Sequence, residues 1–285
     1  MNNYDFEREI INNCSADYKL FCDFQSMLLE IFEVTHNVLK RNNIKYYAIY
    51  GTLLGLYRDK CMIPWDYDFD LMIAFQDAQK TCNILEESLP EEYYVISNFN
   101  NKDFPFYQMR VCKKGFSHLL HVDIFYYIPS PNEKNKQKIY ISKLKRLFYY
   151  RAIKNSKINV YNLKILSIIK TAIKYLVKYF ISNKIIDNHI VRLIKSCVLD
   201  DSLFVFPLNS LMNKIKHSDL GEPQKLIFDN YEIYVPEKVE CVLNSLYKNF
   251  REYPPFEVRY NEYQQGLKLL KGNDKNKIIN SYRKQ

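Results

Sequence analysis

Three aspartates stand at alternate positions directly before an apolar run that is too hydrophobic to lie on a surface. Asp66, Asp68 and Asp70 precede residues 71–74, which read Leu-Met-Ile-Ala. In an extended segment alternate side chains share a face, so the carboxylates project together while Phe69 enters the core. Clustered carboxylates repel one another, and a bound divalent cation resolves that repulsion most simply. Magnesium suits them because it takes one or two carboxylates, keeps several waters and binds substrate phosphates.

A later apolar strand carries one further acid. Over residues 119–127 the alternation places His121, Asp123 and Phe125 on the same side. If this strand neighbours the first, Asp123 becomes the third carboxylate of a one- or two-metal site that can promote displacement at phosphorus. Two alternatives stay open: Asp123 could bond locally near a strand end, and His121 could be a base or simply a core histidine.

Helical and extended patterns alternate along the first half of the chain. Apolar residues spaced by three and four predict an amphipathic helix over about 19–41. Further helices are predicted over 53–60 and 77–89, and strands over 46–50, 69–74, 92–97, 106–112 and 119–127. This order predicts an α/β (α+β) fold in which a mixed sheet is flanked by helices.

A glycine-threonine turn lies between the first predicted strand and the helix after it. Backbone N–H groups at the start of a helix, with a hydroxyl beside them, can cradle a phosphate, so Gly51 and Thr52 are candidate phosphate contacts. Strand, Gly-Thr turn, helix, Asp-x-Asp and a distant third Asp together resemble the layout of the nucleotidyltransferase superfamily. The combination is much more specific than any of its parts.

A longer run narrows this resemblance. Residues 50–70 read Tyr-Gly-Thr-Leu-Leu-Gly-Leu-Tyr-Arg-Asp-Lys-Cys-Met-Ile-Pro-Trp-Asp-Tyr-Asp-Phe-Asp and resemble the signature of the LicD family, which includes bacterial phosphocholine transferases and fukutin-type enzymes. Residues 121–125 and 246–255 are similar to the family's later His/Asp strand and its C-terminal motif. Tyr67 and Asp59 depart from the residues usual in the family, which leaves donor specificity open.

The resemblance implies a metal-dependent transfer of a phospho-alcohol, phosphocholine first among them, from a CDP-linked donor to a sugar hydroxyl. The acceptor would be a cell-surface glycan such as lipopolysaccharide or teichoic acid. Carried over position by position, the resemblance makes Asp68, Asp70 and Asp123 catalytic ligands of Mg²⁺ or Mn²⁺. Any of the three could also take the proton of the attacking hydroxyl.

Four further residues acquire roles from the same resemblance. Gly51 and Thr52 would lie against the donor phosphates. Arg58 would hold a phosphate, with a plain surface helix charge as the alternative. Asp66 would support the metal ligands or be a further ligand itself.

The middle of the chain differs sharply in charge from the rest. From Lys134 to Lys195 there are 16 Lys or Arg residues and one acid, Asp187, whereas the net charge of the whole chain is +9. Apolar residues between Ile165 and Phe180 recur at helical spacing. A basic amphipathic helix of this kind adsorbs to anionic membrane surfaces, and the alternative is a helical subdomain that packs on the core with a solvated basic face.

Charge and pattern together predict three regions. Residues 1–130 form a nucleotidyltransferase-like catalytic core, residues 131–200 a basic and mostly helical insertion, and residues 201–285 a helical and loop region that packs back on the core. Seven scattered cysteines without a C-x-x-C pair and an N-terminus without a recognisable secretion signal favour a reducing cytoplasm. We therefore expect a cytoplasmic protein, either free or peripheral on the inner face of the membrane.

Two other functions stay open. The first is a nucleotidyltransferase that acts on nucleic acid or a small molecule, which the positive net charge would also suit. Against nucleic acid, the basic segment is dominated by lysine and interleaved with large aliphatic residues. The second is a non-catalytic glycan- or nucleotide-binding protein, which would gain nothing from three clustered acids. The expected partners are a nucleotide-activated donor and a glycan or lipid-linked glycan acceptor, with no nucleic acid.

Overall fold

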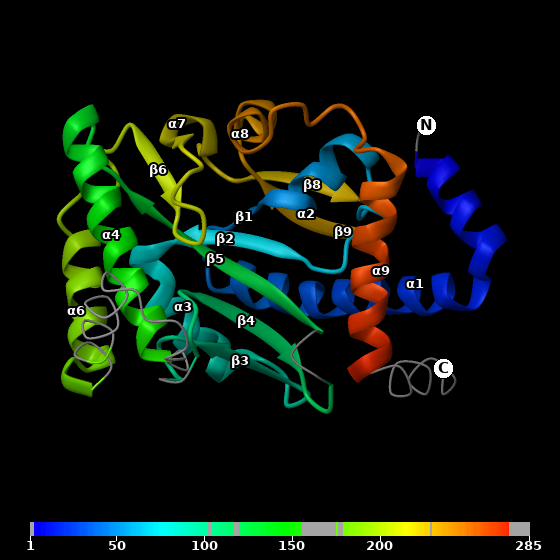
Figure 1. Ribbon diagram of the computed structural model, residues 1–285, viewed down its shortest axis with the longest axis horizontal. Helices are drawn as coiled ribbons and strands as arrows, with labels where there is room; N and C mark the ends of the chain where they lie inside the picture. Colours follow the sequence, from blue (N-terminus) through cyan, green and yellow to red (C-terminus); the bar gives the residue numbers. More distant parts are fainter. Residues whose placement is uncertain are drawn as a thin grey trace, which may run out of the picture.

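A mixed seven-stranded sheet forms the centre of the computed structural model (Figure 1). The strands follow the order β1-β2-β5-β4-β3, and β6 pairs with the far end of β5 and with β7. Their bounds are Tyr47–Ala48 for β1, Asp70–Ala74 for β2, Tyr93–Ser97 for β3, Gln108–Lys113 for β4, His121–Pro129 for β5, Phe204–Pro207 for β6 and Ile215–Lys216 for β7. The structure describes residues 3–101, 104–116, 120–155, 175, 179–228 and 230–273.

Strands β2 and β5 are the parallel pair at the middle of the sheet, and the other neighbouring strands are antiparallel. Every residue of β2 and of β5 is buried. Burial on both faces explains why these two segments are so continuously apolar, since helices must cover each side of such a strand. The predicted mixed α/β sheet flanked by helices is therefore confirmed.

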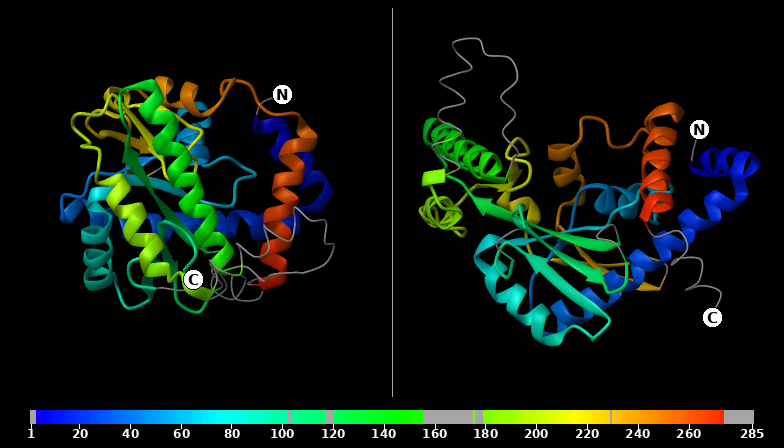
Figure 2. Two further views of the ribbon diagram at one scale, coloured as in Figure 1. Left: turned by 60° about the vertical axis from the view of Figure 1, so that its left-hand side comes forward. Right: turned by 60° about the horizontal axis from the view of Figure 1, so that its bottom comes forward.

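Two long helices cover the sheet on one side. Helix α1 (Asn3–Arg41) and helix α3 (Phe75–Ser88) contact each other and β5, and Figure 2 (right) shows both beneath the sheet. Phe21, Phe24, Leu28, Ile31 and Phe32 of α1 are almost completely buried, as the spacing by three and four requires for a helix with one core-facing side.

The opposite side of β2 carries shorter elements. Helix α2 (Tyr50–Leu54) continues without a break into a single π-helical turn, η1 (Gly55–Asp59), and α2 contacts both β2 and helix α8 (Val239–Leu246). Helix α9 (Phe256–Asn273) crosses near α1 at the edge of the molecule (Figure 1). These elements and the amino-terminal ends of β2 and β5 enclose the candidate site.

The chain after residue 200 contributes strands as well as helices, although we expected only helices and loops there. Strands β6 and β7 extend the main sheet, helix α7 (His217–Leu220) follows them, and β8 (Gln224–Phe228) and β9 (Tyr231–Val235) form a separate hairpin. β6 and β7 are too short for a hydrophobic alternation to be read from the sequence. The division into three regions stays a prediction.

The basic segment is described only at its two ends. Helix α4 (Lys134–Asn155) and helix α6 (Asn183–Ile194) pack against each other at the end of the sheet beyond β6 (Figure 1). The amphipathic helix expected between Ile165 and Phe180 lies almost wholly outside the described residues. Within the described ranges, none of the helices combines the length and hydrophobicity needed to cross a bilayer.

Candidate functional site

The register of the two parallel strands brings the predicted acids together. Asp70, the first residue of β2, is the Cα partner of Asp123 on β5, and the Asp123 N–H donates to the carbonyl of Phe69 at 2.9 Å. Paired residues on neighbouring strands point to the same face, so the two carboxylates lie on one side of the sheet, and Asp68 lies two residues before Asp70 on the same face. Whether these aspartates are metal ligands stays a prediction.

Asp123 is held by donors on two strands. Its Oδ1 accepts hydrogen bonds from Gln108 Nε2 at 2.6 Å and Arg110 Nε at 2.9 Å, and His121 Nε2 lies 3.3 Å from Oδ2. Burial alone would raise the pKa of Asp123, but the hydrogen bond and charge of His121, together with those of Arg110, outweigh it and hold the pKa below its ordinary value. Asp123 is therefore a fixed, ionised carboxylate.

The other three aspartates have the opposite electrostatics. Burial raises the pKa of Asp66, Asp68 and Asp70 and is the largest cause for each of them. Repulsion between carboxylates adds to it: Asp68 raises the pKa of Asp66 and of Asp70. Asp123 likewise raises the pKa of Asp68 and of Asp70. Asp70 Oδ1 is completely buried and accepts no hydrogen bond from the described residues. The charge of Arg110 lowers the pKa of Asp68 and Asp70, but burial and the neighbouring carboxylates outweigh it.

The donor chemistry of this cluster fits a hard divalent cation. A buried carboxylate oxygen without a partner, beside a second carboxylate of raised pKa, is the kind of group that magnesium or manganese satisfies. Among the residues that the structure describes, no three His, Cys, Asp or Glu side chains are already arranged around one metal position. Asp68 and Asp70 would hold the ion. Asp123 could join them only by sharing Oδ1, which accepts from Arg110, or Oδ2, which lies beside His121.

Gly51 and Thr52 lie inside the first turn of α2, because the chain turns one residue earlier than we predicted. Tyr50 makes that turn with a left-handed φ of 50°. A Cβ at Gly51 would come closer to Asp66 Oδ2 than van der Waals contact allows, so glycine is what lets this carboxylate approach the helix. Thr52 is buried, and its Oγ1 accepts the Asp70 N–H at 2.8 Å. The two residues therefore position Asp66 and Asp70, while their contact with donor phosphates stays a prediction.

Whether Arg58 holds a phosphate stays a prediction, but its side chain is only 8% exposed. Its Nε and Nη2 donate to the two carboxylate oxygens of Asp59 at 2.9 and 3.0 Å, and its guanidinium stacks 4.2 Å from the ring centre of Tyr253. The Tyr253 hydroxyl also donates to Asp59 at 2.6 Å. Asp59 thus fixes Arg58 at the wall of the site, and only Nη1 is left with a long contact, 3.5 Å from the Glu252 carbonyl.

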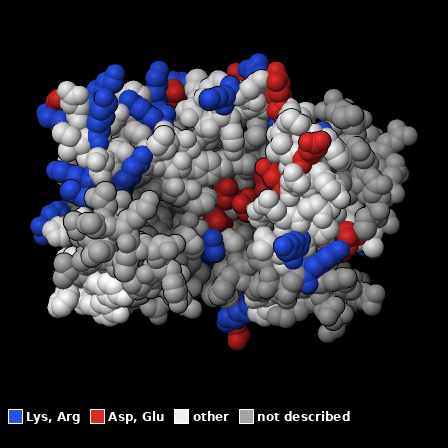
Figure 3. Space-filling view, viewed as in Figure 1, with Lys and Arg blue, Asp and Glu red and all other residues white. Residues whose placement is uncertain are grey.

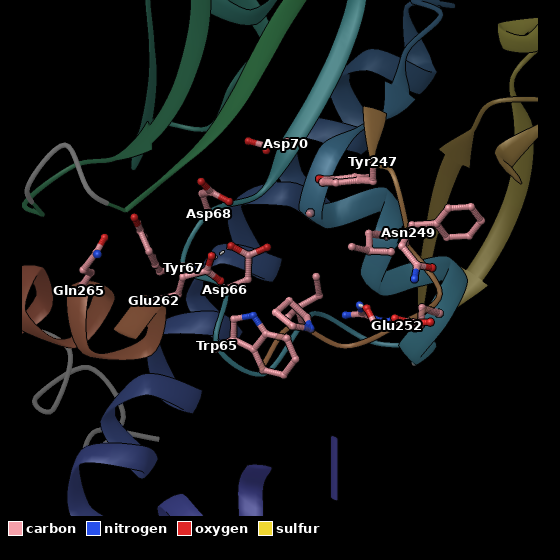
Figure 4. A pocket seen from close by; sticks show the side chains of 16 residues that line it. Trp65, Asp66, Tyr67, Asp68, Asp70, Tyr247, Asn249, Glu252, Glu262 and Gln265 are labelled. Atoms are coloured by element: carbon pink, nitrogen blue, oxygen red, sulfur yellow. Dashed lines mark hydrogen bonds between the residues drawn. The ribbon is translucent and has the colours of Figure 1, made fainter. Parts of the chain in front are cut away.

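These residues line a cavity of about 450 Å³, whose side chains Figure 4 shows. Gly51, Arg58, Asp66, Asp68 and Asp70 face it, whereas Thr52 and Asp123 are not among its lining residues. The far wall comes from the C-terminal part of the chain: Tyr247, Asn249, Phe250, Glu252, Pro254, Glu262 and Gln265. In Figure 3 acidic side chains gather in this hollow, beside α9.

The sequence pointed to only part of this wall. The segment 246–255 was similar to a family motif, which would have drawn attention to Tyr247 and Glu252. Glu262 and Gln265 lie one helical turn apart on α9 and carried no signal. Arg110 and Gln108 were also missed, because nothing in a single sequence tells which strand pairs with β5 on its other edge.

Comparison with known proteins finds a family model that matches the region of the site. Residues 43–162 match the family model described as LicD/FKTN/FKRP, nucleotidyltransferase domain, and this range includes all the predicted site residues. A lipopolysaccharide cholinephosphotransferase, LicD, from Haemophilus influenzae is 27% identical over 118 residues, which are 38% of this chain and 44% of that protein.

Two uncharacterized rickettsial proteins match over shorter stretches. The one from Rickettsia prowazekii is 44% identical over 60 residues, 21% of this chain and 23% of its own length. The one from Rickettsia typhi is 44% identical over 50 residues, 18% of this chain and 16% of its own length. The chain thus spans less than half the length of each of these curated relatives.

Proposed function

We propose, from the premise that residues 43–162 are a LicD-family nucleotidyltransferase domain, that this protein transfers a phospho-alcohol from a CDP-linked donor to a sugar hydroxyl of a cell-surface glycan. Phosphocholine is the first candidate, with lipopolysaccharide or teichoic acid as acceptor, because one relative is named a lipopolysaccharide cholinephosphotransferase. The observation that carries the proposal is the pairing of Asp70 with Asp123 across β2 and β5. Asp68 lies beside them, and the Oδ1 of Asp70 has no hydrogen-bond partner among the described residues.

The reaction is a displacement at the phosphorus next to the alcohol. The acceptor oxygen forms a new bond to that phosphorus while the bond to CMP breaks. A divalent cation bound at Asp68 and Asp70 would neutralise charge on the phosphate oxygens. Asp68 is partly exposed and lines the cavity, whereas Asp70 and Asp123 are buried, so Asp68 is the carboxylate best placed to accept the proton of the attacking hydroxyl.

The remaining residues keep the carboxylates in place. Arg110 and His121 hold Asp123 ionised, and Thr52 fixes the backbone of Asp70. The aromatic wall opposite, formed by Tyr247 and Phe250, would exclude water from the reacting atoms. A cavity of about 450 Å³ is within the range of small-molecule sites, which is about 300–1,000 Å³.

The test is a transfer assay with the purified full chain. CDP-choline, CDP-ribitol and CDP-glycerol are each incubated with glycan from cells that lack the protein, with and without MgCl₂, and CMP release and glycan mass are measured. We expect magnesium-dependent CMP release with one donor, matched by an added phospho-alcohol on the glycan. Asp70→Asn should lose this activity, and the exposed Asp200→Asn should retain it.

The same assay separates the alternatives. Incorporation of CMP from CTP into RNA, with no transfer from CDP-alcohols, would identify a nucleic-acid enzyme instead. Magnesium-independent binding of CDP-choline without CMP release, equal in wild type and Asp70→Asn, would identify a binding protein.

A further inference from the structure

A basic groove lies between helices α4 and α6, and it shares no residue with the catalytic cavity. Its volume is about 350 Å³. Lys143 and Arg146 line it from α4, His189 and Arg192 from α6, and two half-buried leucines, Leu147 and Leu193, complete the lining together with Ser196.

The positive charge of this groove is not neutralised by the described part of the chain. Lys143, Arg146 and Arg192 are exposed, and none of them forms an ion pair with another described residue. The one acid within the two helices, Asp187, is occupied elsewhere, since it accepts from Arg151 Nε at 2.8 Å. An anion in the groove would therefore meet several cationic donors and no competing carboxylate from these helices.

Large apolar side chains are also exposed on the two helices that form the groove. Ile139 and Tyr149 on α4 are 56% and 51% exposed, and Ile185 on α6 and Val198 just after it are 49% and 59% exposed. Apolar groups interleaved with basic ones lie favourably at the boundary between lipid headgroups and acyl chains. A surface that only follows nucleic-acid phosphates gains nothing from exposed isoleucine and valine.

We propose that the α4–α6 groove binds the phosphate headgroup of an anionic phospholipid and thereby docks the protein on a membrane surface. Figure 3 shows basic side chains over α4 and α6 on the same face of the molecule as the acidic hollow of the catalytic cavity. Docking through the groove would place that hollow on the membrane side of the molecule, where an acceptor held at the membrane can approach.

The experiment is vesicle flotation of the full chain. The probes are vesicles of phosphatidylcholine alone and of phosphatidylcholine mixed with phosphatidylglycerol, each at low and high salt. The groove variant is Lys143→Gln/Arg146→Gln/Arg192→Gln. The matched control, Lys19→Gln/Lys80→Gln/Lys114→Gln, removes the same charge from exposed positions on α1, on α3 and after β4. Melting temperatures verify that all three proteins are folded.

We expect wild type and control to float with phosphatidylglycerol vesicles at low salt and not with phosphatidylcholine alone. The groove variant should bind roughly 100-fold more weakly, because each basic residue near an anionic surface contributes about a factor of five to affinity. Equal flotation of groove variant and wild type would overturn the proposal. So would binding of inorganic phosphate or single-stranded RNA in the groove without any vesicle binding, since those results assign it to a soluble phosphate ester or to nucleic acid.

Discussion

Asp70 and Asp123 are direct partners on neighbouring parallel strands, yet their surroundings are opposite. Asp123 accepts hydrogen bonds from Gln108 and Arg110 and lies beside His121, whereas Asp70 Oδ1 is buried with no partner among the described residues. One carboxylate is stabilised as an anion and the other is destabilised by burial and by its neighbours. The pair thus combines a fixed anchor with an oxygen that is available to a cation.

This asymmetry predicts that the same substitution has opposite effects on stability. Asp70→Asn removes a charge that the fold does not neutralise, so the free energy of unfolding should stay equal or rise. Asp123→Asn leaves Arg110 without its partner, so it should lower the free energy of unfolding by about 3 kcal/mol. Both variants should lose transfer activity by at least about 100-fold if the carboxylates act at the reacting phosphate. Urea denaturation without added metal and the CMP-release assay measure the two effects, and equal destabilisation by both substitutions would contradict the asymmetry.

Gly51 predicts a coupling with Asp66. Gly51→Ala places a methyl group against Asp66 Oδ2, so it should lower the melting temperature and displace the carboxylate from the cavity. In an Asp66→Ala background that contact is gone, and the cost of Gly51→Ala should be smaller. A double-mutant cycle by thermal unfolding measures the coupling. Additive effects of the two substitutions would show that the steric argument is wrong.

Thr52 predicts a difference between two conservative replacements. Its Oγ1 accepts the N–H of Asp70 at 2.8 Å in a buried setting. Thr52→Val keeps the shape and leaves that N–H unsatisfied, so it should lower the free energy of unfolding by about 1–3 kcal/mol. Thr52→Ser keeps the acceptor and should cost less. Chemical denaturation of both variants decides the matter, and an equal loss would assign the effect to packing.

Local patterns in the sequence predicted most of the core elements. The strands expected over 92–97 and 106–112 are β3 (Tyr93–Ser97) and β4 (Gln108–Lys113), each within about two residues. The helix expected from about residue 19 instead begins at Asn3. The preceding segment lacks a clear apolar period but contains no glycine or proline, so nothing in it ends a helix once the packed part has formed.

The candidate site was predictable where it depends on alternation within a strand. The likeness to the LicD family, stated from residues 50–70, is confirmed by the matching family model. The alternation of side chains predicted that Asp70 and Asp123 share a face if their strands are neighbours, and β2 and β5 are neighbours. The residues that surround them, such as Arg110 on β4 and Glu262 on α9, depend on long-range packing that leaves no periodic trace in the sequence.

A further prediction concerns stability in acid and involves Glu232 on the β8–β9 hairpin. Its carboxylate lies 2.8 Å from Lys225 Nζ and 2.7 Å from Lys40 Nζ, and it thereby ties the hairpin to α1. Hydrogen bonds from Lys225 and Lys40 lower the pKa of Glu232 from 4.5 to about 2. Because the folded state favours the ionised form, the stabilisation is fully present above the unfolded pKa and is lost as the pH falls through about 2.

Glu232→Gln should therefore be less stable than wild type at neutral pH, and the difference should disappear in acid. At low salt we expect about 1 kcal/mol at pH 7, since the lysines are partly exposed and solvent screens the pair. The difference should shrink between pH 4.5 and 2 and also at high salt. Glu222→Gln is the matched control, because its pair with Lys45 is largely exposed and should contribute little. Urea denaturation across this pH range measures both variants, and a Glu232→Gln difference that stays constant down to pH 2 would show that its cause is not the ionised carboxylate.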